Sequence, residues 1–154
     1  MARIDKDTTS AIVAKFGGKP ELLVQIMATI VNRFGWVPED TIRQLATELN
    51  LSRADVHGVV EYYHDFRTEE PGKHIIKICQ AEACQAMGSK ALTDYAEKTL
   101  AMSMHDTEND ITLEPVYCLG NCACSPAIMA NGKTFGRVDE KRFNAIMDDL
   151  RGEA

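Results

Sequence analysis

The sequence predicts an α/β protein in two parts, a bundle of four helices over residues 1–70 and a small α/β domain over residues 71–154. Three observations support this prediction. Apolar residues recur at helical spacing through about the first 66 residues. The segment 68–72, Thr-Glu-Glu-Pro-Gly, breaks the chain, and the apolar period changes there from helix to strand. Two short β-like runs, at 74–78 and 113–117, then each lead directly into a pair of cysteines.

The first part is expected to contain four helices, at residues 7–16, 20–34, 39–49 and 52–66. Pro20 suits the first turn of the second helix. Ser52 and Asp55 form a variant of the capping box at the start of the fourth. Apolar side chains at helical spacing are the predicted core: Leu23, Ile26, Met27, Ile30, Phe34, Ile42, Leu45, Ala46, Leu49, Val56, Val59, Val60, Tyr63 and Phe66.

The second part is expected to contain, in order, a strand, a helix, a strand, a hairpin and a helix, at residues 73–78, 86–101, 112–117, 126–138 and 139–150. Asn131-Gly132 is a favoured pair for the type I′ turn of a hairpin. Asp139 is the expected cap of the last helix, whose inward side chains are Phe143, Ile146, Met147 and Leu150. This order of elements is that of a small α/β layer of the thioredoxin type.

Composition places the chain among globular proteins, with 45% hydrophobic and 26% charged residues. The sequence contains no apolar run of the 18 or so residues that a membrane span requires, and its N-terminus lacks the apolar segment of a secretory signal. Five cysteines, an odd number, favour the reducing cytoplasm over a disulfide framework. The net charge of −6 is spread evenly, so neither part is expected to bind nucleic acid or an anionic membrane.

Residues 41–56 resemble a helix-turn-helix, in which the second helix would enter the major groove of DNA. The surface of that helix offers only Arg53 as a cation, against the carboxylates of Asp55, Glu61 and Asp65. Phosphate contacts supply most of the non-specific affinity for DNA, and an acidic helix cannot make them. Ordinary helix packing is therefore the preferred interpretation.

The candidate metal ligands are Cys79 and Cys84, with four residues between them, and Cys118 and Cys122, with three. Zinc sites mostly use two-residue spacing within a pair, and the Cys-x-x-Cys of a thiol–disulfide pair is absent. Four thiolates in two wide pairs suit a 2Fe–2S rhombus, in which each iron takes two cysteines. Spacing thus favours iron–sulfur over a structural zinc site, and Cys124 is either a fifth ligand or a bystander.

The pattern Cys-x4-Cys, a helix, then Cys-Leu-Gly-x-Cys-x3-Pro resembles the thioredoxin-like 2Fe–2S ferredoxins. That family includes the 24-kDa-type subunit of respiratory complex I and its relatives in NAD-linked dehydrogenases and hydrogenases. The resemblance covers nearly the whole chain, because these subunits also carry an N-terminal helical bundle, whose end is similar to residues 57–66. Residues 81–88 and 118–127 are most similar to one branch, the gamma subunits of cytoplasmic NAD-dependent molybdenum or tungsten formate dehydrogenases.

The resemblance implies one 2Fe–2S cluster held by Cys79, Cys84, Cys118 and Cys122, and gives Cys124 no ligand role. It also implies a hetero-oligomer. The cluster would lie beside a flavin- and NAD-binding iron–sulfur subunit, and formate would react at a molybdopterin site in another subunit. An NADH:quinone oxidoreductase or an NAD-reducing hydrogenase is the alternative parent complex.

No residues with the features of a catalytic acid–base site, a flavin site or a nucleotide site are evident, so no catalytic residue is expected. The chain is expected to carry electrons and not to turn over a substrate by itself. A low reduction potential is expected, because the cluster gains negative charge within an acidic chain. Gly120 would let backbone amides approach the sulfurs. The hypothesis of a different class is a zinc-stabilised interaction module without redox activity.

Overall fold

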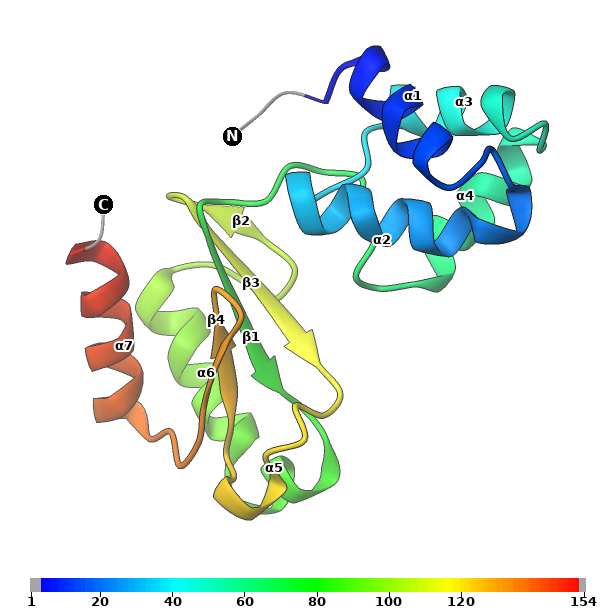
Figure 1. Cartoon of the computed structure of the whole chain (residues 1–154). Coiled ribbons are helices and arrows are strands. Elements are labelled where there is room, and N and C mark those ends of the chain that lie inside the picture. The colour runs from blue at the N-terminus through cyan, green and yellow to red at the C-terminus, as the bar shows by residue number, and fades with distance from the viewer. Residues whose placement is uncertain (1–3, 153–154) are drawn as a thin grey trace. The chain divides into compact units, whose positions relative to one another are not determined.

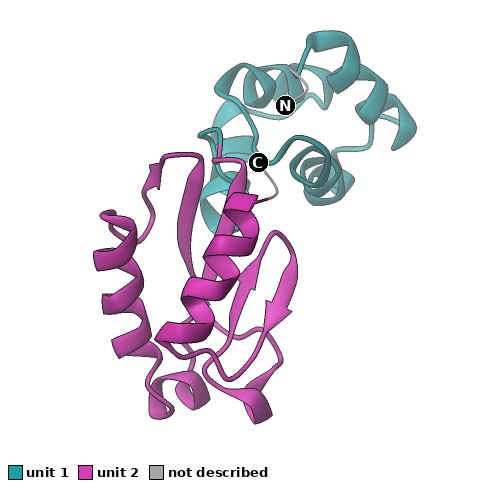
Figure 2. Ribbon diagram, turned by 90° about the vertical axis from the view of Figure 1, so that its left-hand side faces the viewer, with its two compact units in different colours: residues 1–70 teal, residues 71–154 magenta. Residues whose placement is uncertain are grey.

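The computed structural model describes residues 4–152, in a chain that divides into two compact units, Met1–Glu70 and Pro71–Ala154 (Figure 2). The first unit is helical, and the second contains a mixed five-stranded sheet with helices. The fold class predicted from the sequence, helices followed by a thioredoxin-like α/β layer, is confirmed. Among the helices within residues 4–152, none combines the length and apolar content needed to cross a bilayer.

The first unit contains the four predicted helices and one short 3₁₀ helix (Figure 1). They are α1 (Lys6–Lys15), η1 (Pro20–Leu22), α2 (Leu23–Phe34), α3 (Glu39–Glu48) and α4 (Arg53–Tyr62). Pro20 therefore opens the 3₁₀ turn that precedes α2, and not α2 itself. The predicted stripes of α2 and α3 are buried together with Val56, Val60 and Phe66 in one apolar core.

The two ends of α4 differ in how well the sequence predicts them. At its start the Asp55 N–H donates to Ser52 Oγ over 3.1 Å and the Ser52 N–H donates to Asp55 Oδ2 over 3.2 Å, which confirms the capping box. At its end the helix stops at Tyr62, because Tyr63 is extended and its carbonyl accepts from the Phe66 N–H. Tyr63 is 40% exposed, so its placement in the core is wrong.

The sheet of the second unit has the order β2-β3-β1-β4-β5. Its strands are β1 (His74–Cys79), β2 (Thr107–Glu108), β3 (Ile111–Val116), β4 (Ile128–Ala130) and β5 (Lys133–Phe135). β1 and β3 are parallel, with His74 opposite Ile111, and the other pairs are antiparallel. The helices are α5 (Glu82–Ala86), α6 (Ser89–Leu100) and α7 (Glu140–Gly152).

Helices α6 and α7 pack on one face of this sheet (Figure 1). Ile76 and Ile78 of β1 are fully buried there, while Lys77 between them lies on the other face and pairs with Glu114 at 3.7 Å. The two helices meet through Tyr95 and Phe143, whose rings lie edge to face with centroids 6.2 Å apart. The predicted inward side chains of the last helix are all buried in this core.

Turns in the second unit follow the predicted chemistry at two positions. Asn131 and Gly132 have φ values of 48° and 81°, which a type I′ turn requires. The Arg142 N–H donates to Asp139 Oδ1 over 2.8 Å, so Asp139 caps α7 as expected. The helix predicted at 86–101 is α6, which begins only at Ser89 because Gly88 has a φ of 94° that a helix cannot accommodate, and the short helix α5 before it was not predicted.

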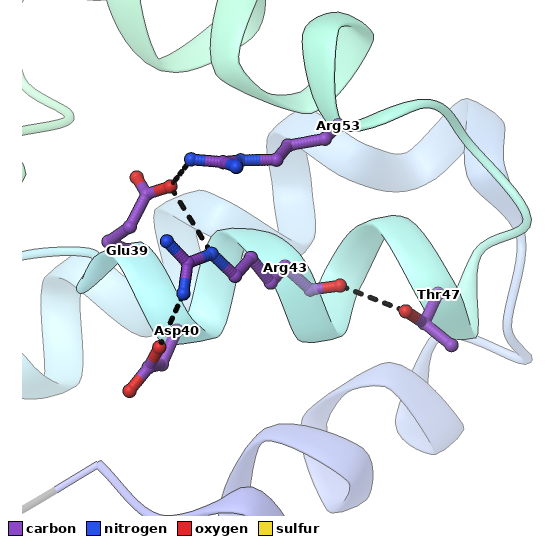
Figure 3. A network of polar contacts seen from close by, with 5 residues as sticks. All are labelled: Glu39, Asp40, Arg43, Thr47 and Arg53. Carbon is purple, nitrogen blue, oxygen red and sulfur yellow. Dashed lines mark hydrogen bonds and ion pairs between the residues drawn. The ribbon is translucent and has the colours of Figure 1, made fainter.

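The helix-turn-helix-like segment of the first unit has its arginines in ion pairs (Figure 3). The Arg43 guanidinium lies 3.6 Å from the Glu39 carboxylate and 3.4 Å from that of Asp40. Arg53 pairs with the same Glu39 carboxylate from the start of α4. Both arginines of this segment therefore have carboxylate partners.

Candidate metal centre

The four candidate cysteines come together at one end of the sheet. Cys79 is the last residue of β1 and pairs in register with Val116, two residues before Cys118. Because β1 and β3 are parallel, their carboxyl ends lie at the same edge of the sheet. Cys79 and Cys84 are 2% exposed, whereas Cys118 and Cys122 are exposed. Cys84 lies in the short helix α5 and not in a loop.

The buried pair is held by backbone groups of two different segments. Burial raises the pKa of the Cys79 thiol, and hydrogen bonding from the Ala81 and Leu119 amides opposes that effect in part. Leu119 belongs to the loop that follows β3, so this loop lies directly over Cys79. The Cys79 N–H donates to the Ala127 carbonyl over 3.0 Å, which extends the pairing of β1 toward β4.

Cys84 is the thiol most strongly supported by polar neighbours. Burial works to raise its pKa, but the Ser125 hydroxyl, the Cys79 thiol and the Ala127 amide together bring the pKa of Cys84 below its ordinary value. Cys84 Sγ lies 3.4 Å from Ser125 Oγ. The Ser125 hydroxyl in turn donates to the Cys122 carbonyl over 2.8 Å. Ser125 thus connects the buried pair with the backbone of the exposed pair.

The exposed pair is formed by a tight turn. Cys118 Sγ and Cys122 Sγ are 3.8 Å apart, and this contact raises the pKa of Cys122. The Gly120 N–H donates to Cys118 Sγ over 3.3 Å, with Gly120 at a φ of 71° that favours glycine. Cys118 itself has a φ of 118°, which side-chain-bearing residues rarely adopt and which is typical of functional sites. The Cys84 and Cys79 charges also act on Cys122, so the two pairs are close neighbours.

Cys124 occupies a structural position beside this turn. It ends the 3₁₀ helix η2 (Cys122–Cys124), and its N–H donates to the Asn121 carbonyl over 2.9 Å. Gly136 packs against it so closely that a Cβ on Gly136 would lie 2.6 Å from Cys124 Cβ. Cys124 is therefore half-buried between its own turn and the segment that follows β5.

The donor set fits an anionic two-iron group. The thiols form two pairs, and a 2Fe–2S rhombus takes two cysteines at each iron. The amides of Leu119, Gly120 and Ala127 donate toward the sulfurs, which stabilises thiolates over thiols.

The structure places the four predicted cysteines at one end of the sheet, but the sequence prediction does not identify Ser125 or the Leu119 amide as their neighbours. Ser125 lies 41 residues from Cys84 in the chain, so only the fold brings them together. The one sequence feature that could have pointed to Ser125 is its place three positions after Cys122, in the second cysteine loop. The role of Gly120 in bringing an amide to a sulfur, by contrast, is visible in both the sequence and the structure.

Comparison with known proteins adds relatives and a fold. The chain is 32% identical over 131 residues to the E subunit of NADH-quinone oxidoreductase from Buchnera aphidicola, covering 84% of this chain and 77% of the relative. The corresponding protein of Mycobacterium bovis is 23% identical and aligns with 99% of this chain, which spans 61% of that relative's length. A crystal structure of an NAD⁺-reducing [NiFe]-hydrogenase shares the fold with a TM-score of 0.72 at 19% identity, over 86% of this chain and 23% of the hydrogenase chain.

The sequence model of thioredoxin-like [2Fe-2S] ferredoxins matches residues 9–151, which is most of both units. This family implies a 2Fe–2S cluster as the cofactor, in agreement with the paired thiols. On that match, the chain belongs to the thioredoxin-like [2Fe-2S] ferredoxin family.

Proposed function

We propose that the chain carries one 2Fe–2S cluster on Cys79, Cys84, Cys118 and Cys122, and passes single electrons within an NAD-linked oxidoreductase complex. The observation that carries this proposal is the meeting of two thiol pairs at the carboxyl ends of two parallel strands. One pair is buried and the other exposed. This asymmetry suits a carrier, because the buried pair fixes the cluster while the exposed pair lies near an electron-transfer partner.

The residues around the thiols have the features of a carrier site and not of a substrate site. When bound, the cluster supplies a one-electron redox centre whose potential responds to hydrogen bonds and solvent exposure. The chain's own contribution is to hold the thiolates, to donate amide hydrogen bonds to the sulfurs, and to exclude water from Cys79 and Cys84. Turnover of formate, hydrogen or quinone is assigned to other subunits.

The parent complex is a finer proposal, and two kinds of observation bear on it. Relatives that belong to NADH-quinone oxidoreductases support a complex I-type parent, and the fold shared with an NAD⁺-reducing hydrogenase supports the related hydrogenase. Residues 81–88 and 118–127 support the gamma subunit of a formate dehydrogenase, on resemblance alone. All three parents place a flavin- and NAD-binding subunit beside the chain, and the formate parent adds a molybdopterin subunit.

The ligand set is tested by replacing each cysteine with serine. Cys79→Ser, Cys84→Ser, Cys118→Ser and Cys122→Ser should each lower the cluster content sharply or shift its spectrum. Cys124→Ser is the matched control and should retain about two irons per chain, the stoichiometry of one 2Fe–2S cluster. Iron analysis and EPR of the dithionite-reduced protein provide the measurement. Cluster loss in Cys124→Ser together with retention in Cys122→Ser would overturn the assignment, and a colourless wild-type protein with bound zinc would favour the zinc module.

The parent complex is tested by purifying the tagged chain from its native cells and assaying the complex. NADH oxidation coupled to quinone, NAD⁺ reduction by hydrogen and NAD⁺ reduction by formate distinguish the three parents. Mass spectrometry of the copurifying subunits gives an independent answer. The isolated chain should catalyse none of these reactions, and turnover by the purified chain alone would contradict the carrier role.

A further inference from the structure

We propose that Ser125 is a positioning residue that donates a hydrogen bond to the Cys84 sulfur in the cluster-bound protein and raises the reduction potential of the cluster. The inference rests on the proposed function, because it takes Cys84 and Cys122 as ligands. It concerns the redox property of the site and not its assembly. The residue is 8% exposed, so water does not compete effectively for its hydroxyl group.

The hydroxyl proton of Ser125 has two possible acceptors, the Cys122 carbonyl and the Cys84 sulfur. A serine hydroxyl has one O–H donor and two acceptor lone pairs. With Cys84 as a thiol, the S–H donates to Ser125 Oγ over 3.4 Å, and the Ser125 O–H donates to the Cys122 carbonyl over 2.8 Å. The Cys122 carbonyl also accepts from the Ser125 N–H over 3.3 Å. The carbonyl therefore keeps a partner if the hydroxyl proton turns away.

Ligation removes the thiol proton and reverses the direction of the Cys84–Ser125 bond. A cysteine ligand is a thiolate, which has no proton to donate and can only accept. The Ser125 O–H is the hydroxyl donor at 3.4 Å from that sulfur.

A hydrogen bond to a ligand sulfur favours the reduced cluster. Reduction adds one electron to the cluster, takes up no proton and neither forms nor breaks a bond to Ser125. The sulfurs become more negative, so a donor at the sulfur is stronger in the reduced state. Loss of the donor should therefore lower the reduction potential.

The chain offers a matched control in Ser89. This serine is also buried, and its hydroxyl donates to the Cys79 carbonyl, not to a sulfur. Ser89→Ala thus removes a buried hydroxyl beside the same cysteine pair without removing a donor to a ligand atom. It should lower stability and leave the midpoint potential unchanged.

The test is an EPR-monitored redox titration of the full-length protein, reconstituted with iron and sulfide and reduced with dithionite. At a fixed potential, Ser125→Ala should lower the ratio of reduced to oxidised cluster about tenfold, which corresponds to about 59 mV for a one-electron couple. Ser125→Thr keeps the hydroxyl and should have the midpoint potential of the wild type. Ser125→Val, in which valine has nearly the shape of threonine but no hydroxyl, should have the lowered potential of Ser125→Ala. In D₂O, deuterium ENDOR of the reduced wild-type cluster should contain an exchangeable coupling that Ser125→Ala lacks.

Each outcome supports or overturns the inference. A full cluster in Ser125→Ala with an unchanged midpoint overturns it and leaves the proposed function intact. Equal shifts in Ser125→Ala and Ser89→Ala overturn it too, because the effect would then be general loosening of the site. Cluster loss in both Ser125→Ala and Ser125→Val would assign the hydroxyl to assembly and not to the potential. A wild-type protein that binds no two-iron cluster overturns the proposed function and the inference together.

Discussion

Gly136 is the residue at which a single methyl group should disturb the metal centre most directly. A Cβ built on Gly136 lies 2.6 Å from Cys124 Cβ, 2.7 Å from Asn121 Nδ2 and 2.7 Å from the Cys124 carbonyl oxygen. Ordinary van der Waals contact begins at about 3.4 Å, and two of these three atoms belong to main chain or to a Cβ, which cannot turn away. The turn 121–124, which carries the proposed ligand Cys122, must therefore move by several tenths of an ångström in Gly136→Ala.

The expected cost follows from the nature of the clash. Overpacking a well-packed site by one methyl group typically costs about 1–3 kcal/mol. Gly136 does not have a φ in the left-handed region, so backbone strain adds nothing and the effect isolates the contact. For a unit of this size, about 1–3 kcal/mol corresponds to a lowering of the melting temperature by roughly 5–20 °C.

The assay follows circular dichroism and visible absorbance of the reconstituted protein during heating, because absorbance of the cluster reports on the second unit specifically. Gly152→Ala is the matched control, since a Cβ there has no heavy atom within 4 Å and Gly152 also lies outside the left-handed region. Its melting temperature should equal or slightly exceed that of the wild type, because Gly152 ends α7 and a helix favours alanine over glycine. If Gly136→Ala retains all its iron and melts within about 2 °C of wild type, the reasoning that Gly136 fixes the turn 121–124 is refuted.

Two further predictions concern the first unit and its separation from the site. Ser52→Ala removes the capping box of α4 and should lower the free energy of unfolding by about 1 kcal/mol, measured by a urea titration followed by circular dichroism. The iron content should not change. A loss of iron would contradict the assignment of all ligands to residues 71–154. A fragment that begins at Thr68 should still assemble the cluster, because it retains β1, β3 and all four thiols, and should bind the flavin-containing partner more weakly than the full chain in a titration of the two proteins. If the fragment and the full chain bind the partner with equal affinity, the helical unit, with its half-buried Trp36, is not a docking element.

The sequence predicts most of the secondary structure because the strong periodic signals coincide with the core. Ile26, Met27 and Ile30 of α2 recur on one helical face and are fully buried. The signals fail where a local choice depends on tertiary contacts. The pattern predicts a helix from 86, yet Gly88 is left-handed and α6 begins only at Ser89, while the five-residue helix α5, which carries Cys84, was not predicted.

The sequence predicts a set of candidate ligands but not their arrangement. Cysteine spacing and the strands before each pair identify four thiols, because the metal chemistry constrains those residue types. Nothing local indicates which pair is buried, and the structure shows that only Cys79 and Cys84 are. Contacts such as Cys84 with Ser125, or Gly136 with Cys124, join segments that are distant in sequence or carry no periodic signal.

The parallel pairing of β1 and β3 is what makes the two cysteine pairs one site. In register, Cys79 lies opposite Val116, and the Gln80 N–H donates to the Val116 carbonyl over 2.8 Å beyond the last paired residue. This additional hydrogen bond keeps the segments that follow β1 and β3 side by side beyond the sheet, so the loop after β3 lies over the buried cysteine pair. A shift of one residue in this register would turn Cys79 to the opposite face of the sheet, away from the Leu119 amide. The register of one strand pair, set by the buried isoleucines of β1, therefore determines whether four thiols separated by up to 43 residues in the chain can act as a single ligand set.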